Sequence, residues 1–194
     1  MNSLNPQINQ RHSVRLKKYD YSSAGAYFVT ICTQNRECLF GNICVGAGPR
    51  ACPEMVLLDA GRMITSVWQQ IPSHYPGNDI DELVVMPNHI HGIIIIVGTS
   101  KNGQSELPGG RPQGVAPTGL SLSDVVHRFK TMTTKQYTDG VKQSGWQPYY
   151  GKLWQRSYYE HVIRDEDELS EVRQYISTNP LKWALDRENP EYRR

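Results

Sequence analysis

The sequence predicts a protein of mixed helices and strands, in the order strand, helix, strand, strand, helix, strand, helix. Residues 25–33 are rich in strand-forming side chains of alternating polarity, which predicts the first strand. Residues 57–71 carry apolar side chains at helical spacing, and Pro72 ends the run, which predicts the first helix. Residues 82–97 are rich in branched apolar side chains broken by a Pro-Asn pair, so two buried strands are expected to meet there at a tight turn.

The second half of the chain is predicted to add two helices with a strand between them. Ser123 is expected to cap a helix whose apolar stripe continues to Met132. The aromatic stretch around Tyr159 is expected to form a strand. Asp165, followed three residues later by Glu168, is a capping-box pattern and predicts that a second helix begins there.

The composition is that of a single globular domain, residues 1–194, with 38% hydrophobic and 21% charged residues. The longest apolar run, residues 93–97, is too short to span a membrane, and no secretory signal precedes it. The four cysteines form no Cys-x-x-Cys pair, so a zinc ribbon is not expected. These features favour a cytoplasmic protein with reduced thiols and no membrane partner.

Two stretches, residues 45–53 and 98–119, are rich in glycine and proline and show no periodicity. Neither matches a phosphate-binding loop, because no Gly-Lys-Ser/Thr sequence follows. Both are expected to be flexible insertions in the domain.

The net charge of +2 says little about nucleic acid, but its distribution says more. An acid-free basic arm lies within residues 1–18, and basic side chains recur on the helix expected after residue 123. The basic residues in question are Arg11, Arg15, Lys17 and Lys18 in the arm and Arg128 and Lys130 on the helix. Such groups can be solvated surface, and they become candidates for binding DNA phosphates only beside a nucleic-acid active site.

Two histidines flank one isoleucine at the start of the strand that follows the Pro-Asn turn. Side chains alternate along a strand, so His89 and His91 are expected to emerge on one face and Ile90 on the other. Adjacent imidazoles form half of a metal site, although a His-x-His pair also occurs as an ordinary structural feature.

Tyr175 and Asn179 are four residues apart and so are expected to share one face of the last helix, near its C-terminal end. On their own they could be a half-buried tyrosine and a helix-ending asparagine. With the histidines they suggest one chemistry. A divalent cation held by His89, His91 and the Asn179 carbonyl oxygen would leave positions open for phosphate oxygens. The Tyr175 phenol is then the candidate nucleophile, which would form a covalent phosphotyrosine.

Four sequence blocks, in this order, resemble those of the REP-associated tyrosine transposases. The blocks are Tyr-Asp-Tyr-Ser (19–22), Val-Met-Pro-Asn-His-Ile-His-Gly (85–92), Trp-Gln-Arg-Ser-Tyr-Tyr-Glu-His-Val-Ile-Arg (154–164) and Tyr-Ile-x-x-Asn-Pro (175–180). This family belongs to the HUH single-tyrosine endonucleases and is similar to the small insertion-sequence transposases. Apart from the two insertions, the resemblance covers most of residues 11–183.

The resemblance implies an α+β fold, a ferredoxin-like palm. An antiparallel sheet would have the HUH motif on a central strand, with helices packed on it and the tyrosine helix nearby. It implies metal-dependent cutting and rejoining of single-stranded DNA near REP hairpins in DNA transposition, a form of recombination, by a monomer or a homodimer. Mg²⁺ or Mn²⁺ would be bound by His89, His91 and Asn179, and Tyr175 would receive the 5′ phosphate. Glu160 and His161 would support the active site or contact DNA.

Other classes share parts of this pattern. The histidine-triad nucleotide hydrolases carry a third alternating histidine, whereas this chain has Ile93 at that position. A non-catalytic regulator that binds DNA hairpins, such as a domesticated transposase, would have the same fold. A rolling-circle replication initiator or relaxase would have the same metal motif, although such proteins are usually larger.

Overall fold

The computed structural model describes residues 19–45, 53–97 and 120–192. Their centre is a four-stranded antiparallel sheet in the order β4-β5-β1-β6. The strands are β1 (Gly25–Cys32), β4 (Asn78–Val85), β5 (His89–Ile96) and β6 (Tyr159–Ile163). The strand that carries the His pair therefore lies inside the sheet, between β4 and β1. This arrangement confirms the expected α+β class with an antiparallel sheet.

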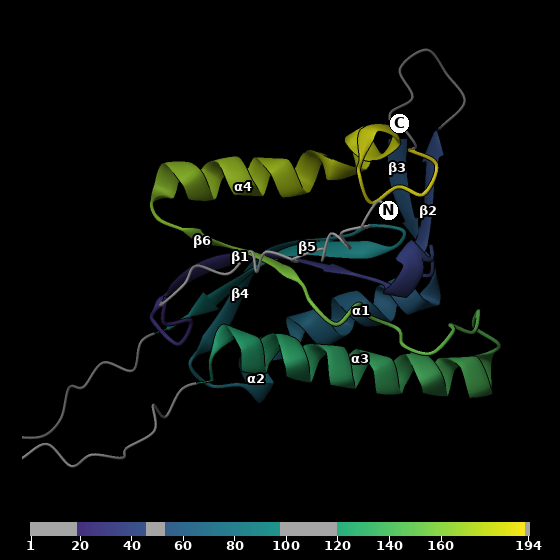
Figure 1. Ribbon diagram of the computed structural model, residues 1–194, viewed down its shortest axis with the longest axis horizontal. Coiled ribbons are helices and arrows are strands. Elements are labelled where there is room, and N and C mark those ends of the chain that lie inside the picture. Colours follow the sequence, from purple (N-terminus) through teal and green to yellow (C-terminus); the bar gives the residue numbers. More distant parts are fainter. Residues whose placement is uncertain (1–18, 46–52, 98–119, 193–194) are drawn as a thin grey trace, which may run out of the picture.

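Helices cover both faces of the sheet (Figure 1). On one face lie α1 (Asp59–Gln69) and α3 (Leu122–Ser144), with the short α2 (Ile71–His74) beside them. On the other face α4 (Glu166–Thr178) lies alone and continues into the 3₁₀ helix η2 (Asn179–Leu185). Within the described residues, no helix is both long enough and apolar enough to cross a membrane.

Because side chains alternate along β5, this strand contributes to the apolar cores on both faces of the sheet. Ile90 and Ile94 are fully buried in the larger apolar core, under α1 and α3. Ile93 is fully buried in a smaller core, with Leu169 and Ile176 of α4. Burial of each such side chain stabilises the fold by about 1.5–3 kcal/mol. A strand covered on both faces needs apolar residues at successive positions, which explains the unbroken apolar run that the sequence shows after residue 92.

Gly92, just before this run, faces Trp68 of α1. A Cβ atom at Gly92 would lie 2.5 Å from the Trp68 ring of α1, well inside van der Waals contact. Trp68 is itself almost completely buried and meets Phe129 of α3 edge to face. The absence of a side chain at Gly92 therefore allows the indole to pack directly on the strand.

Several local predictions need correction. The cap of α3 is Ser121, which forms a reciprocal capping box with Asp124, and Ser123 lies inside the first turn. The helix predicted over residues 57–71 is observed as the shorter α1, which begins at Asp59 because Leu57 is still the last residue of a strand. Pro72 does not stop helical structure there but lies in the first turn of α2, where a missing N–H costs nothing.

A two-stranded hairpin, β2 (Gly41–Val45) and β3 (Pro53–Leu57), was not predicted. Its strands include both ends of the 45–53 segment, whereas residues 46–52 lie outside the described residues. The predicted 98–119 insertion and the 1–18 arm lie outside them as well. The hairpin packs near η2, at one end of the sheet.

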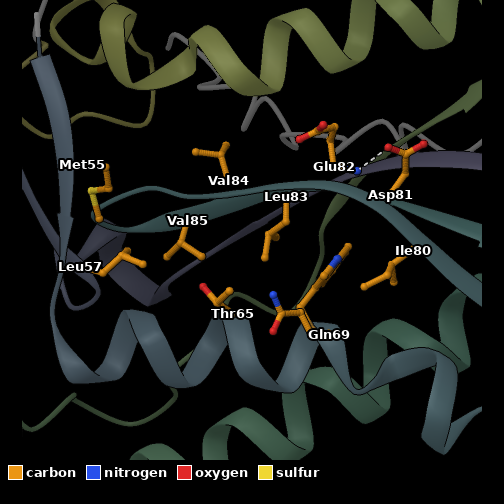
Figure 2. A pocket seen from close by; sticks show the side chains of 11 residues that line it. Met55, Leu57, Thr65, Gln69, Ile80, Asp81, Glu82, Leu83, Val84 and Val85 are labelled. Carbon is orange, nitrogen blue, oxygen red and sulfur yellow. Dashed lines mark hydrogen bonds between the residues drawn. The ribbon is translucent and has the colours of Figure 1, made fainter.

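A groove of about 530 Å³ follows the edge strand β4, between α1 and the hairpin (Figure 2). The pairing of β4 with β5 shifts register between Ile80 and Leu83. As a result Asp81 and Glu82 both lie on the α4 side, while Leu83 points toward α1. Asp81 accepts hydrogen bonds from Arg173, and this ion pair fastens α4 to the sheet.

Candidate active site

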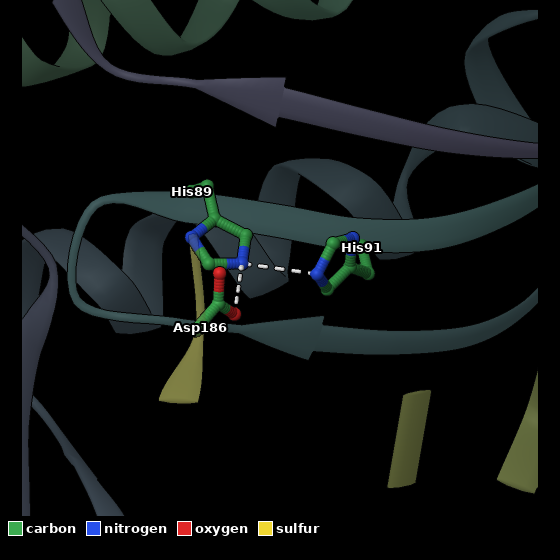
Figure 3. A group of neighbouring side chains, drawn as sticks. All are labelled: His89, His91 and Asp186. Carbon is green, nitrogen blue, oxygen red and sulfur yellow. Dashed lines mark hydrogen bonds and ion pairs between the residues drawn. The ribbon is translucent and has the colours of Figure 1, made fainter. Parts of the chain in front are cut away.

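The His pair lies on the α4 face of the sheet, at the start of β5. His89 and His91 pair across the strands with Cys32 and Thr30 of β1, and both imidazoles are almost completely buried. Their Nε2 atoms are 3.0 Å apart (Figure 3). The alternation of the strand therefore brings both rings to one point, as the sequence predicts.

The Nδ1 atom of each histidine has a hydrogen-bonding partner on the other side of its ring. His89 Nδ1 is 2.8 Å from Asn88 Oδ1, and His91 Nδ1 is 2.8 Å from Thr30 Oγ1. Burial lowers the pKa of His91 to about 3 and holds that of His89 well below its ordinary value, where the neighbouring His91 and Arg36 act in the same direction. Both imidazoles are thus neutral at physiological pH, which is the form that binds a metal.

An aspartate that the sequence did not reveal completes the group. Asp186 Oδ2 lies 3.7 Å from His89 Nε2, and the candidate ligand atoms of His89, His91 and Asp186 all lie within 4.8 Å of one another (Figure 3). Burial is the main cause that raises the pKa of Asp186. A cation between these atoms would compensate for the burial of a carboxylate.

Asp186 comes from a segment without periodicity, just after η2. Trp183 of η2 places its ring centroid 6.0 Å from that of His89. Two residues after Asp186, Glu188 forms an ion pair of 2.8 Å with Arg36. Because these contacts join residues far apart in the chain, no local spacing in the sequence could have identified Asp186.

Tyr175 faces the His pair from the last turn of α4. Its hydroxyl oxygen is 3.5 Å from His91 Nε2, and its ring meets those of His91 and Phe28. The residue keeps 42% of its surface exposed and lines the pocket, so a substrate can reach its side chain. Burial of the other part raises the pKa of Tyr175, and the nearby Asp186 adds to this effect. The phenol is therefore protonated at neutral pH.

Asn179 lies one turn beyond Tyr175, where α4 passes into η2. Its backbone is helical (φ −59°, ψ −41°) despite the following proline, so the expected shared face with Tyr175 is present. The side chain is 2% exposed, and its Oδ1 has no hydrogen-bond partner among the described residues. A buried acceptor without a partner is costly, which fits an oxygen that can serve a cation.

These groups open onto a pocket of about 780 Å³ on the α4 side of the sheet. Its lining includes His91, Tyr175, Asn179 and Asp186, and the exposed cations Lys182 and Arg187. The pocket thus combines the candidate nucleophile, candidate ligands and positive charge. Its volume is in the range of sites that hold small molecules or a few nucleotide groups.

Known proteins are similar to this chain in sequence and in fold. A sequence profile of the family described as "Transposase IS200 like" matches residues 115–179, a range that includes Tyr175. A Haemophilus influenzae protein without an assigned function is 39% identical over 94% of this chain and 94% of its own length. A second H. influenzae protein, provisionally named a REP-associated tyrosine transposase, is 25% identical over 84% of this chain and 74% of its own.

A solved structure of a REP-associated tyrosine transposase bound to a REP hairpin shares the fold. Its TM-score is 0.53, with 18% identity over 87% of this chain and 73% of that one. In sequence and in fold, the chain is therefore similar to the REP-associated tyrosine transposases. The matched family profile ends at Asn179 and so does not reach Asp186.

The fold places two neighbouring residues of β6 on opposite faces of the sheet. His161 pairs with Phe28, lines the pocket and bonds Glu168 Oε1 at 2.6 Å. Glu160 pairs with Val29, whose side chain belongs to the core under α1 and α3. Of these two predicted support residues, only His161 is therefore brought to the His pair's side.

The predicted basic helix face belongs to the other layer of the molecule. Arg128 of α3 lies 5.1 Å above the Tyr75 ring. The Lys130 ammonium donates to the carbonyl oxygens of Gln155 and Ser157, and burial lowers its pKa to about 8. Lys130 therefore contributes to the fold of its own chain. The predicted DNA-binding residues of the 1–18 arm lie outside the described residues.

Proposed function

We propose that this protein is a metal-dependent endonuclease and strand transferase that cuts single-stranded DNA beside a hairpin. The observation that carries the proposal is the approach of the Tyr175 hydroxyl to within 3.5 Å of His91 Nε2, at the mouth of the pocket. A nucleophile, nitrogen ligands and a half-buried carboxylate thus meet at one point. That combination is typical of metal-assisted phosphoryl transfer.

His89, His91, Asp186 and Asn179 would hold the cation, which we expect to be Mg²⁺ or Mn²⁺. Their fit is supported by two convergent Nε2 atoms, a carboxylate within 4.8 Å and the Asn179 oxygen without a partner. Imidazole nitrogens favour Mn²⁺ over Mg²⁺, whereas the oxygens suit both ions. When bound, the cation would supply positive charge to the phosphate that is attacked.

The covalent step is carried by Tyr175. Its phenol oxygen attacks the phosphorus, the bond from phosphorus to the 3′ oxygen breaks, and the phenol loses its proton while the 3′ oxygen gains one. The products are a 5′-phosphotyrosine and a free 3′ hydroxyl. The raised pKa of Tyr175 means that the phenolate is scarce at neutral pH, so the cation or the substrate would have to assist the loss of the phenol proton.

The pocket favours a single strand over a duplex, because one phosphate must approach both the Tyr175 hydroxyl and the buried His pair. Lys182 and Arg187 at the rim can contact the flanking phosphates. The REP hairpin bound by the relative of known structure supports a hairpin beside the cut site. Since Tyr175 faces the His91 of its own chain, one copy contains the whole site, which supports cleavage in cis by a monomer.

The test is incubation of the full chain with labelled single-stranded DNA that carries a hairpin from beside its gene, in Mn²⁺ or Mg²⁺. We expect a covalent protein–DNA adduct that Tyr175→Phe and EDTA both abolish. Tyr159→Phe is the matched control, since Tyr159 is equally exposed and lines the same pocket. An adduct that persists in Tyr175→Phe would overturn the assignment. Tight hairpin binding without any adduct would instead identify a non-catalytic regulator.

A further inference from the structure

The Asn88 side chain, in the turn between β4 and β5, is fully buried and uses all of its polar atoms. Its Nδ2 lies 2.7 Å from the carbonyl oxygen of Glu188 and 3.1 Å from that of Arg36. A carbonyl oxygen only accepts hydrogen bonds, so the atom that faces both must be the amide nitrogen, and both of its hydrogens are used. The orientation of the amide is thereby fixed.

This orientation determines the tautomer of His89. The amide oxygen of Asn88 only accepts, so His89 Nδ1, 2.8 Å away, must carry the hydrogen. A neutral imidazole has one such hydrogen, and the Nε2 of His89 is left with its lone pair. That lone pair points into the site, toward His91 and Asp186. His89 is thus held in the form that offers Nε2 to a cation.

The hydrogen-bonding partner of His91 Nδ1 can act either as a donor or as an acceptor. The Thr30 hydroxyl, 2.8 Å from His91 Nδ1, can donate or accept. Without a cation, His91 Nε2 donates its hydrogen to the bare Nε2 of His89, and Thr30 donates to Nδ1. If both Nε2 atoms were to bind a cation, the proton of His91 would reside on Nδ1 and Thr30 would accept it. The proton count of the ring stays the same.

Asn88 also anchors the segment that carries Asp186. Its bond to the Glu188 carbonyl holds the chain two residues beyond Asp186, and the Arg36–Glu188 ion pair adds a second attachment. Asp186 is therefore kept beside His89 by the same amide that orients His89. Groups behind a metal site that fix its ligands affect affinity strongly when removed.

We propose that Asn88 is a positioning residue that fixes the His89 tautomer and holds Asp186 beside it, whereas Thr30 lets His91 adopt either tautomer. The inference rests on the proposed metal site. Its first measurement needs neither metal nor DNA, so it can fail or succeed independently of the proposed activity.

The first test is long-range ¹H–¹⁵N correlation NMR on metal-free protein with ¹⁵N-labelled histidine at neutral pH. We expect His89 with hydrogen on Nδ1 and a bare Nε2, and His91 with hydrogen on Nε2. Addition of Zn²⁺, a diamagnetic probe, should move the His91 hydrogen to Nδ1 and leave His89 unchanged. A hydrogen on Nε2 of His89 in the free protein would overturn the proposal.

The second test separates the two roles of Asn88. Asn88→Asp keeps an acceptor for His89 but loses both donors, so the His89 tautomer should persist while hydrogen exchange of residues 186–192 accelerates. Asn88→Ala removes both functions, and Mn²⁺ binding measured by calorimetry should weaken about 10- to 100-fold. Glu188→Ala is the control, because it removes the ion pair but keeps the carbonyl. The proposal would be contradicted if both Asn88 variants kept the wild-type hydrogen exchange of residues 186–192 and the wild-type Mn²⁺ affinity. If neither variant folds, the histidine tautomers in the NMR spectrum of the wild type decide.

A matched pair of variants tests Thr30. Thr30→Ser keeps a hydroxyl and should bind Mn²⁺ like the wild type, whereas the isosteric Thr30→Val offers neither donor nor acceptor. The Val variant should bind Mn²⁺ about 10-fold more weakly and show a mixture of His91 tautomers. Equal affinity of the Ser and Val variants would exclude the role assigned to Thr30.

Discussion

The two faces of the sheet differ in what they carry. The face under α1 and α3 is mainly apolar, with Glu160 of β6 as a buried polar residue, and it packs against Trp68 and Phe129 of these helices. The face under α4 has a small apolar core at one end and the His pair with Tyr175 at the other. The face under α1 and α3 thus mainly stabilises the fold, whereas the face under α4 has a smaller apolar core and a polar pocket. The alternation of β5 lets neighbouring residues serve these different purposes.

The largest expected effect is the loss of chemistry on the α4 face without a loss of stability. Tyr175→Phe should abolish the covalent DNA adduct and leave the free energy of unfolding within about 0.5 kcal/mol of the wild type, because the ring contacts remain and the residue is 42% exposed. Gel analysis of adducts and urea unfolding measure the two quantities. A variant that is strongly destabilised would show that Tyr175 also has a structural role.

Next in size is the comparison of Ile94→Ala with Ile93→Ala, neighbours on β5 that point to opposite faces. Each truncation should cost about 2–5 kcal/mol, because each side chain is fully buried. We expect the larger loss for Ile94, since the single helix over Ile93 can relax into the cavity more easily. Only Ile93→Ala should weaken Mn²⁺ binding, because it lies on the face of His91. Equal Mn²⁺ affinity in both variants would argue against this division of roles.

The pH dependence of stability should also reveal the site. The unfolded chain protonates His91 near its ordinary pKa of 6.5, whereas the folded, metal-free protein does so only at about 3. Between these values the unfolded state binds more protons, so the free energy of unfolding should fall by about 1.4 kcal/mol for each unit of decreasing pH. His91→Asn should give a shallower slope in urea titrations. Identical slopes for the two proteins would contradict the burial of a neutral His91.

The smallest expected effect concerns the contributions of two lysines, one on each layer of helices, to the binding of DNA. Lys182→Gln, at the pocket rim, should reduce the log–log salt slope of single-stranded DNA binding by about 0.7, the value for one lost phosphate contact. Lys130→Gln on the other layer should leave the slope unchanged, because its ammonium bonds carbonyl oxygens of its own chain. Fluorescence anisotropy at several salt concentrations measures both. A reduced slope for Lys130→Gln alone would restore α3 as the DNA surface.

The sequence by itself determined the parts of the site that follow local periodicity. The strand pair at the Pro-Asn turn, the common face of His89 and His91, and the one-turn spacing of Tyr175 and Asn179 were predicted and are present. They depend on the repeat of a strand or a helix, which a sequence displays directly. The family resemblance supplied the palm fold, and the structure confirms its antiparallel sheet.

Only the tertiary structure decided which other residues join the site. Asp186 reaches His89 through the contacts of Asn88 and Arg36 with Glu188, and the Asn88 bond spans 100 residues of sequence. Glu160, next to His161 in the chain, is placed on the opposite face. Irregular segments are positioned by long-range hydrogen bonds and ion pairs rather than by periodicity, so the physical information that places Asp186 does not exist until the chain has folded.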